Sequence, residues 1–336
     1  MPLFCRRCDG RVTQALLRWY AANARDLPFR RIRDPYAIWV SEIMAQQTRI
    51  AALLPYYERF MARFPTPAQL AAASQDEVLA FWAGLGYYAR ARALHKAAQH
   101  MAESGIPSDY QGWRALPGVG DYTAAAIASI AFGQPTPAVD GNVMRVFARL
   151  TCFGGAEKDG KKEAGRWVAG LMAESDVWPG EVTQALMELG ALVCLPQTPH
   201  CADCPVFTDC EACKANRVDE LPYRAPSKPK RIVERDVLVV LDGQNRVLLR
   251  KRTERLLHNL FEFPAGLESI TPVSCRALGE AEHVFTHIIW KMKGFLWRVD
   301  DMPAPEGLVW VTKEEWDTKA VPTAFRQYIR ILQKEW

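Results

Sequence analysis

The sequence predicts a multidomain protein in which an all-α domain is followed by a smaller α+β domain. The chain has 336 residues, 49% of them hydrophobic, so two domains could each bury a core. In residues 1–215 apolar side chains recur every three or four positions, whereas in residues 236–336 they alternate as in β-strands. Residues 216–235 are rich in proline and basic residues, which indicates a linker between the domains.

Helices are expected throughout the first domain. Alanine-rich segments with apolar residues three and four positions apart predict helices over Leu70–Phe81 and Ala89–Met101. Asp34 followed by Pro35 predicts a helix start, because an aspartate side chain caps free N–H groups and proline suits the first turn.

Strands are expected in the second domain. They lie in three stretches, residues 236–249, 283–299 and 307–312. The first stretch predicts a β-hairpin with Asp242 and Gly243 in its turn. Pro322–Trp336 predicts an amphipathic helix, because its apolar residues share one face.

Charge and cysteine content limit the function classes. The net charge is only 42 − 38 = +4, so any surface that binds nucleic acid must be a local patch. No apolar run reaches the ~18 residues of a membrane span, and no secretory signal is evident, so we expect a soluble intracellular protein. Five of the nine cysteines lie within residues 194–213, which favours a metal site over disulfides. Cys5 and Cys8 form a separate pair that we expect to be incidental.

The cysteine cluster has the spacing C-x6-C-x2-C-x5-C, formed by Cys194, Cys201, Cys204 and Cys210. Iron–sulfur cubanes accept such varied spacing, whereas zinc prefers two short pairs. A zinc site remains an alternative, because Cys210 and Cys213 form a second C-x2-C that could join Cys201 and Cys204. Buried thiols without metal are a third interpretation.

A glycine turn and two acids are the candidate functional elements. Gly118 and Gly120 allow close approach, and free N–H groups of a helix that starts near Asp121 could bind a phosphate, although a plain turn has the same pattern. Asp140 could cap a helix and present its second oxygen to a substrate. Glu42 follows Ile38 and Trp39 by one turn; unless it is a surface residue, apolar surroundings should raise its pKa.

Together, the glycine hairpin, the aspartate and the cysteine loop resemble helix-hairpin-helix DNA glycosylases over about residues 11–213. Four stretches further resemble the adenine glycosylases of the MutY type: residues 34–48, 84–94, 139–146 and 184–194. The resemblance implies base-excision repair of double-stranded DNA that contains A·8-oxoguanine or A·G mispairs. It also implies a monomer, which we expect in the bacterial cytoplasm with the nucleoid.

The resemblance implies roles for individual residues. Glu42 would protonate adenine at N7, ionised Asp140 would stabilise the oxocarbenium-like sugar, and Tyr122 and Asn142 would position them. Tyr122 stands where superfamily lyases carry a lysine, so no Schiff base is expected. The residues expected to contact DNA are Arg30, Gln47, Tyr87, Gly118, Val119 and Gly120. A [4Fe-4S] cluster would be bound by Cys194, Cys201, Cys204 and Cys210, in the loop 194–210.

The second domain resembles the C-terminal domain of the same enzymes, which is related to Nudix hydrolases, in residues 248–252 and 260–268. It lacks the glutamate-rich helix that binds magnesium, so we expect binding and not pyrophosphate hydrolysis. The resemblance implies that Phe285, Thr286 and His287 recognise 8-oxoguanine; a plain amphipathic strand is the alternative interpretation.

Two rival functions remain at the sequence level. The first is a glycosylase and lyase of the endonuclease III type, which Tyr122 and the additional domain argue against. The second is a non-enzymatic DNA-binding or redox-sensing iron–sulfur protein, which the pair of Glu42 and Asp140 argues against.

Overall fold

The computed structural model describes residues 10–223, 229–267 and 270–336. The chain forms two compact units. Unit 1 comprises Met1–Gln47, Pro65–Ala68 and Lys96–Pro226, and unit 2 comprises Thr48–Phe64, Gln69–His95 and Ser227–Trp336. Cys5, Cys8 and residues 224–228 of the expected linker lie outside the described residues. Among the helices of the described part, none combines the length and apolar character needed to cross a membrane.

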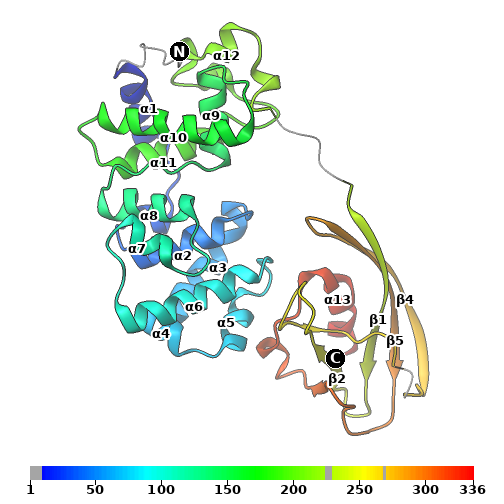
Figure 1. Cartoon of the computed structure of the whole chain (residues 1–336). Coiled ribbons are helices and arrows are strands. Elements are labelled where there is room, and N and C mark those ends of the chain that lie inside the picture. The colour runs from blue at the N-terminus through cyan, green and yellow to red at the C-terminus, as the bar shows by residue number, and fades with distance from the viewer. Residues whose placement is uncertain (1–9, 224–228, 268–269) are drawn as a thin grey trace. The chain divides into compact units, whose positions relative to one another are not determined.

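Unit 1 is helical, as predicted (Figure 1). Its helices are α1 (Arg11–Asn23), α2 (Pro35–Ala45), α7 (Tyr110–Ala115), α8 (Asp121–Phe132), α9 (Gly141–Leu150), α10 (Glu157–Ala173), α11 (Pro179–Leu192) and α12 (Glu211–Lys214). Helix α11 packs against α1, α8, α9 and α10, and most of its residues are buried. Helix α8 packs against α2 and α7 through a largely buried alanine-rich surface. The core of this unit therefore fixes the starts of α8 and α9.

The predicted start of α2 is confirmed. Asp34 caps the helix by accepting a hydrogen bond from the backbone N–H of Tyr36 at 3.0 Å, and Pro35 is the first helical residue. The buried residues of α2 lie on every side of the helix, so α2 has no single apolar face. Packing within the core, and not an amphipathic pattern, therefore determines its position.

The helices between residues 50 and 104 differ in one respect from the prediction. They are α3 (Ile50–Arg63), α4 (Pro67–Ala72), α5 (Gln75–Trp82) and α6 (Ala89–Ser104). The single helix expected over Leu70–Phe81 is wrong: it is split into α4 and α5, because the Ser74 side chain accepts a hydrogen bond from Glu77 N–H and caps a new helix. Helix α6 contains the predicted segment Ala89–Met101 and ends three residues later.

The C-terminal part of unit 2 is a mixed sheet with one long helix (Figure 1). Its strands are β1 (Arg231–Leu241), β2 (Val247–Lys251), β3 (Phe261–Glu262), β4 (Ser274–Val284), β5 (Ile288–Arg298) and β6 (Leu308–Val311). They follow the order β3-β2-β1-β5-β4, with β6 paired to β2; β1 and β5 are parallel, and the other pairs are antiparallel. Helix α13 (Arg326–Glu335) packs its apolar face on the sheet through Tyr328 and Leu332.

The strand predictions hold with two differences. The hairpin of β1 and β2 is confirmed, and Asp242 organises its turn by accepting from the N–H groups of Gln244 and Arg246. However, β1 begins at Arg231, within the expected linker. Residues 283–299 contain the end of β4, a turn and β5, because Phe285–His287 reverses the chain. The sequence does not mark β4 because this edge strand is almost entirely exposed and carries little apolar alternation.

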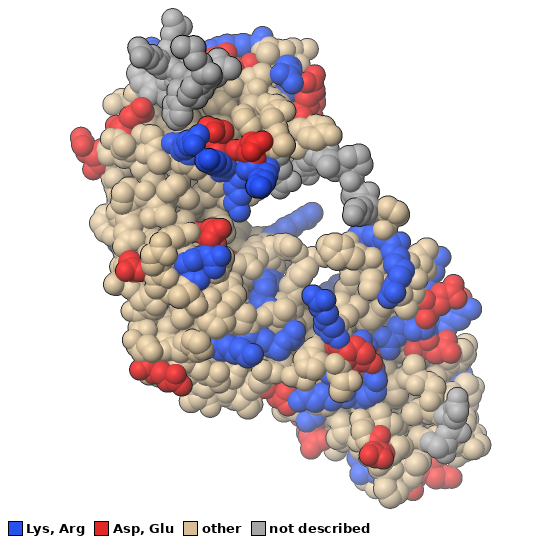
Figure 2. Space-filling view, viewed as in Figure 1, with Lys and Arg blue, Asp and Glu red and all other residues tan. Residues whose placement is uncertain are grey.

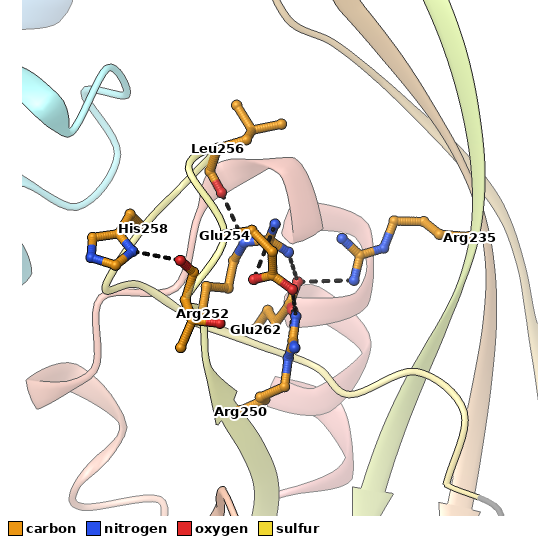
Figure 3. A network of polar contacts seen from close by, with 8 residues as sticks. Arg235, Arg250, Arg252, Glu254, Leu256, His258 and Glu262 are labelled. Atoms are coloured by element: carbon orange, nitrogen blue, oxygen red, sulfur yellow. Dashed lines mark hydrogen bonds and ion pairs between the residues drawn. The ribbon is translucent and has the colours of Figure 1, made fainter.

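A buried acid organises the sheet near β3. Glu262 is 1% exposed and accepts hydrogen bonds from Arg235, Arg250 and Arg252 (Figure 3). Arg250 also binds Glu254 at 2.6 Å. Three arginines around one buried carboxylate hold β1, β2 and β3 together, since an unpaired buried charge would be costly.

Two glycines give a matched test of the packing of unit 1. A Cβ added at Gly180 on α11 would lie 2.6 Å from the backbone Cα of Ile130 on α8, whereas one added at Gly170 on α10 would meet no described atom within 4 Å. Gly180→Ala should therefore lower the free energy of unfolding by about 1–3 kcal/mol, through overpacking. Gly170→Ala should be neutral or stabilising by about 0.5–1 kcal/mol. Denaturant unfolding of both variants checks this, and equal stabilities would contradict the close α8–α11 packing.

Candidate active site

The side chains of Glu42 and Tyr122 meet inside unit 1. Glu42 lies on α2 and Tyr122 in the first turn of α8, and the Tyr122 hydroxyl donates a hydrogen bond to Oε2 of Glu42 at 2.7 Å. Burial and the negative charges of Glu42 and Asp140 raise the pKa of Tyr122 well above its ordinary value of 10.0. The tyrosine therefore remains a hydrogen-bond donor at neutral pH.

Glu42 is in the surroundings expected of a general acid. The residue keeps partial solvent exposure, but protein atoms surround its carboxyl, and this burial raises its pKa above the ordinary 4.5. The charge of Asp140 raises the pKa further, while the hydrogen bond from Tyr122 and the charge of Arg30 lower it. The expectation that apolar surroundings raise the pKa of Glu42 is confirmed in direction.

Asp140 is the N-cap of α9 and is held at both oxygens. Its Oδ1 accepts from the backbone N–H of Val143 at 2.7 Å, and its Oδ2 accepts from the side-chain amide of Asn142 at 2.9 Å. Burial raises the pKa of Asp140 above 3.8, but these hydrogen bonds and the charge of Arg145 counteract the rise. Asp140 is thus better equipped than Glu42 to remain an anion.

Arg30, a residue that the sequence indicates as a DNA contact, has a partner that the sequence does not indicate. Glu188 on α11 is fully buried, and it accepts hydrogen bonds from both Arg30 and Arg25. Burial alone would raise the pKa of Glu188, but Arg25 and Arg30 hold it down to about 2. The signal available in the sequence was one glutamate in the otherwise apolar segment ALMELGAL.

Two buried arginines connect α9 to the cysteine loop. Arg145 donates to the side-chain oxygen of Asn142 at 2.8 Å and to the backbone oxygen of Cys194 at 2.6 Å. Arg149, one turn later, donates to the backbone oxygens of Leu195 and Pro196 and lies 3.4 Å from the Cys194 sulfur. The helix that begins at Asp140 therefore also anchors the start of the cysteine loop.

The five clustered cysteines line one small cavity of about 30 Å³, with Val146, Leu150, Leu189, Val193 and Val206 among its other lining residues. Within the described residues, no three His, Cys, Asp or Glu side chains lie close enough together to hold a single metal ion. A cubane is bound differently, because each thiolate ligates its own iron atom and the sulfurs need not converge on one point. Free thiols around a common apolar cavity fit such a group.

The glycine hairpin has the features needed to approach a phosphate. Gly118 has φ +76°, which favours glycine, and Val119 is buried. Gly120 is the N-cap of α8. Within the described residues, no side chain caps this start of the helix, and no atom lies within 4 Å of the position that a Cβ of Gly120 would occupy. Asp121 follows at once, but the guanidinium of Arg114 pairs with its carboxylate at 2.5 Å.

The two residues expected to enter the base stack both have an unusual backbone conformation. Gln47 has φ +58° and Tyr87 has φ +49°, a region that residues other than glycine rarely adopt. Both side chains are exposed, Tyr87 to 49%. Strained, exposed positions of this kind often occur at functional sites.

The predicted lesion-recognition residues form the turn between β4 and β5. Phe285 packs between His283 and Trp290, with ring centroids 4.6 and 4.9 Å away, so it anchors the turn. Thr286 and His287 are exposed at its tip. The alternative interpretation, a continuous strand through these residues, is wrong.

Basic side chains lie in separate groups on the face of the molecule shown in Figure 2. On the face shown in Figure 2, Lys and Arg lie in several separate groups on both units, with acidic side chains among them. Local groups, together with the backbone donors of the hairpin, must therefore supply any contacts to phosphates.

Comparison with known proteins agrees with this architecture. Residues 40–169 match the model of the HhH-GPD superfamily base excision DNA repair protein, and residues 236–330 match that of the NUDIX domain. The human adenine DNA glycosylase is 34% identical, over 95% of this chain and 73% of its own length. That of Buchnera aphidicola subsp. Schizaphis graminum is 34% identical, over 75% of this chain and 74% of its own.

Solved structures show the same helical fold. A thermostable thymine-DNA glycosylase matches 61% of this chain and 95% of its own, with TM-score 0.55 and 26% identity. Endonuclease III, trapped on DNA, matches 61% of this chain and 94% of its own, with TM-score 0.53 and 24% identity.

The fold and the matched superfamily define a DNA glycosylase of base excision repair, an enzyme that hydrolyses the bond between a base and its deoxyribose. Within that class, the chain belongs to the adenine DNA glycosylase family. The predicted fold class and the resemblance to glycosylases of the MutY type are thus confirmed, and a non-enzymatic role is set aside.

The pairing of Glu188 predicts a pH dependence of stability. Its pKa is lowered from 4.5 to about 2, so its contribution is present above pH 4.5 and is lost as the pH falls toward 2. Near neutral pH, Glu188→Gln should cost about 3 kcal/mol, because it leaves two guanidinium groups without their buried partner. The exposed pair of Glu163 and Arg166 supplies the control: Glu163→Gln should cost under ~1 kcal/mol. Denaturant unfolding at a series of pH values measures the loss of unfolding free energy in both variants. If the loss in Glu188→Gln did not become smaller as the pH falls toward 2, the lowered pKa of Glu188 would be contradicted.

Proposed function

We propose that this adenine DNA glycosylase releases adenine from A·8-oxoguanine and A·G mispairs in double-stranded DNA, leaving an abasic site. The observation that carries the proposal is the arrangement of Glu42 and Asp140, two partly buried acids that influence each other and share Tyr122 as a neighbour. Adenine would first have to leave the base stack, because the glycosidic bond is inaccessible within the duplex.

Glu42 is proposed as the general acid. Adenine is a poor leaving group until a ring nitrogen is protonated, and a carboxyl with a raised pKa holds a proton closer to neutral pH. The proton would pass to N7, and the hydroxyl of Tyr122 would keep the Glu42 carboxyl oriented. In this scheme the bonding electrons leave with the neutral base, and the sugar becomes an oxocarbenium-like cation.

Asp140 is proposed as the anion that stabilises this cation. The N–H of Val143 and the amide of Asn142 favour its ionised form, and a fixed carboxylate needs no reorganisation as the positive charge develops. Water then completes hydrolysis at the sugar. Because Tyr122 has no amine, we propose that the enzyme forms no Schiff base and is monofunctional.

The DNA would be held by several elements. The hairpin Gly118–Gly120 would bind a backbone phosphate through the N–H groups of α8, and Gln47 and Tyr87 would occupy the space left in the stack. Arg30, anchored by Glu188, would contact the extruded nucleoside. Residues 236–336, as a Nudix-like domain joined to residues 1–215 through the linker 216–235, would recognise the opposite base.

Recognition of 8-oxoguanine is assigned to the turn between β4 and β5. Thr286 offers a hydroxyl and His287 an imidazole at the exposed tip, and the packed ring of Phe285 holds the turn in place. Both polar side chains can exchange hydrogen bonds with the altered edge of the base.

A [4Fe-4S] cluster bound by Cys194, Cys201, Cys204 and Cys210 is part of the proposal. Its irons would cross-link four points of the loop, which is structural chemistry that hydrolysis does not consume. Arg149 and Arg145 would transmit the order of that loop to α9. We propose that the enzyme acts as a monomer.

Replacement of Glu42 tests the mechanism. In single-turnover assays with adenine opposite 8-oxoguanine, Glu42→Gln should slow base release at least about 100-fold while DNA affinity is kept. The wild-type rate should fall as the pH rises through the raised pKa of Glu42, since the protonated acid is the active form. Glu181→Gln, at an exposed site on α11, is the control. The product should break only with alkali, and thymine glycol should not be cleaved. Base release by Glu42→Gln at the wild-type rate would refute the assignment.

Replacement of the turn residues tests lesion recognition. Thr286→Ala and His287→Ala should each reduce the preference for A·8-oxoguanine over A·G by about tenfold, because one lost hydrogen bond is worth ~1–1.5 kcal/mol. Ser274→Ala, at the far end of β4, should leave the preference unchanged. Competition between the two duplexes measures it. An equal loss on both duplexes would assign the turn to general DNA binding.

A further inference from the structure

A fifth cysteine lies at the cavity that would hold the cluster. Cys213 lines this cavity together with Cys194, Cys201, Cys204 and Cys210. Like the four expected ligands, it is a free thiol. The spacing C-x6-C-x2-C-x5-C leaves Cys213 without a role.

The local backbone places Cys213 where it can replace Cys210. Cys210 is the N-cap of the single turn α12, and Cys213 follows three residues later, on the same side of that turn. The N–H of Lys214 donates to the backbone oxygen of Cys210 at 3.1 Å, so the turn is closed between the two cysteines. An exchange between their sulfurs would need rotation of side chains, without refolding of the loop.

The loop around the cavity is held independently of any one sulfur. Arg149 binds the backbone oxygens of Leu195, Pro196, Val218 and Leu221, which lie before and after the residues 201–213 that carry the other four cysteines. Loss of one ligand would therefore leave the cavity and Cys213 in place.

We infer that Cys213 is a reserve ligand of the iron–sulfur cluster, able to replace Cys210 or Cys201 when either bond to iron is lost. The inference rests on the proposed cluster. In the exchange, the Cys213 thiol gives its proton to solvent and its thiolate forms a bond to iron, while the departing thiolate takes up a proton. No electrons are transferred, so the iron atoms keep their oxidation states.

Single and double replacements test the reserve ligand, with alanine used because it cannot ligate. Each full-length variant is reconstituted with iron and sulfide, and iron content and visible absorption are measured. Cys210→Ala should keep iron within about twofold of wild type, and Cys210→Ala/Cys213→Ala should lose at least about tenfold. Cys213→Ala alone should keep its iron. Cys194→Ala is the matched control and should lose iron, because Cys194 follows the end of α11, whereas Cys213 lies in α12 next to Cys210.

The outcomes separate this inference from the proposed cluster. Equal iron loss in Cys210→Ala and the double variant, with iron-loaded wild type, would overturn the reserve ligand alone. If Cys210→Ala fails to fold by circular dichroism, Cys201→Ala and Cys201→Ala/Cys213→Ala give the same comparison. A wild-type protein that takes up zinc and no iron, with the same zinc content after Cys194→Ala, would overturn both the proposed cluster and the reserve ligand. That result would favour a zinc site formed by Cys201, Cys204, Cys210 and Cys213.

Discussion

The hydrogen bond from the N–H of Val143 to Asp140 fixes the start of α9, and the candidate site is arranged around that start. Asn142 braces the second oxygen of Asp140, and Arg145 braces Asn142 while it holds the backbone of Gly190 and Cys194. A side chain at Gly190 would collide with Asn142, since an added Cβ would lie 2.6 Å from the asparagine Cβ. One helix end thus combines a capping interaction, helix packing and the anchor of the cysteine loop.

Electrostatics distinguishes the acids that unit 1 buries. Glu188 faces two guanidinium groups and is held ionised, Asp140 receives N–H donors, and Glu42 has mainly burial and one tyrosine hydroxyl. Three carboxyl groups of similar intrinsic acidity are therefore suited to anchor an arginine, to stabilise a cation and to donate a proton. The same low polarity that keeps Glu42 protonated closer to neutral pH makes hydrogen-bonding partners necessary for Asp140 and Glu188, which have to stay ionised.

In the C-terminal domain, local sequence patterns predict some of the strands and not others. The β1–β2 hairpin and β6 follow from alternating apolar residues and from the turn chemistry of Asp242, so they could be predicted. Strand β4 could not, because its pairing with β5 orders it while most of its side chains remain in solvent. The turn at Phe285–His287 could not be predicted either, since its residues fit a strand equally well; only the resemblance to known proteins pointed to these residues.

The sequence by itself determined the elements whose cause is local. Asp34 and Pro35 start α2, the glycines of the hairpin precede α8, and the cysteine spacing marks the loop whose thiols share one cavity. The tertiary structure alone decided which charges meet. Glu188 lies 158 positions from Arg30 along the chain, and Tyr122 lies 80 from Glu42, yet each pair is in contact. Such contacts depend on how α2, α8 and α11 pack, and no local spacing encodes that packing.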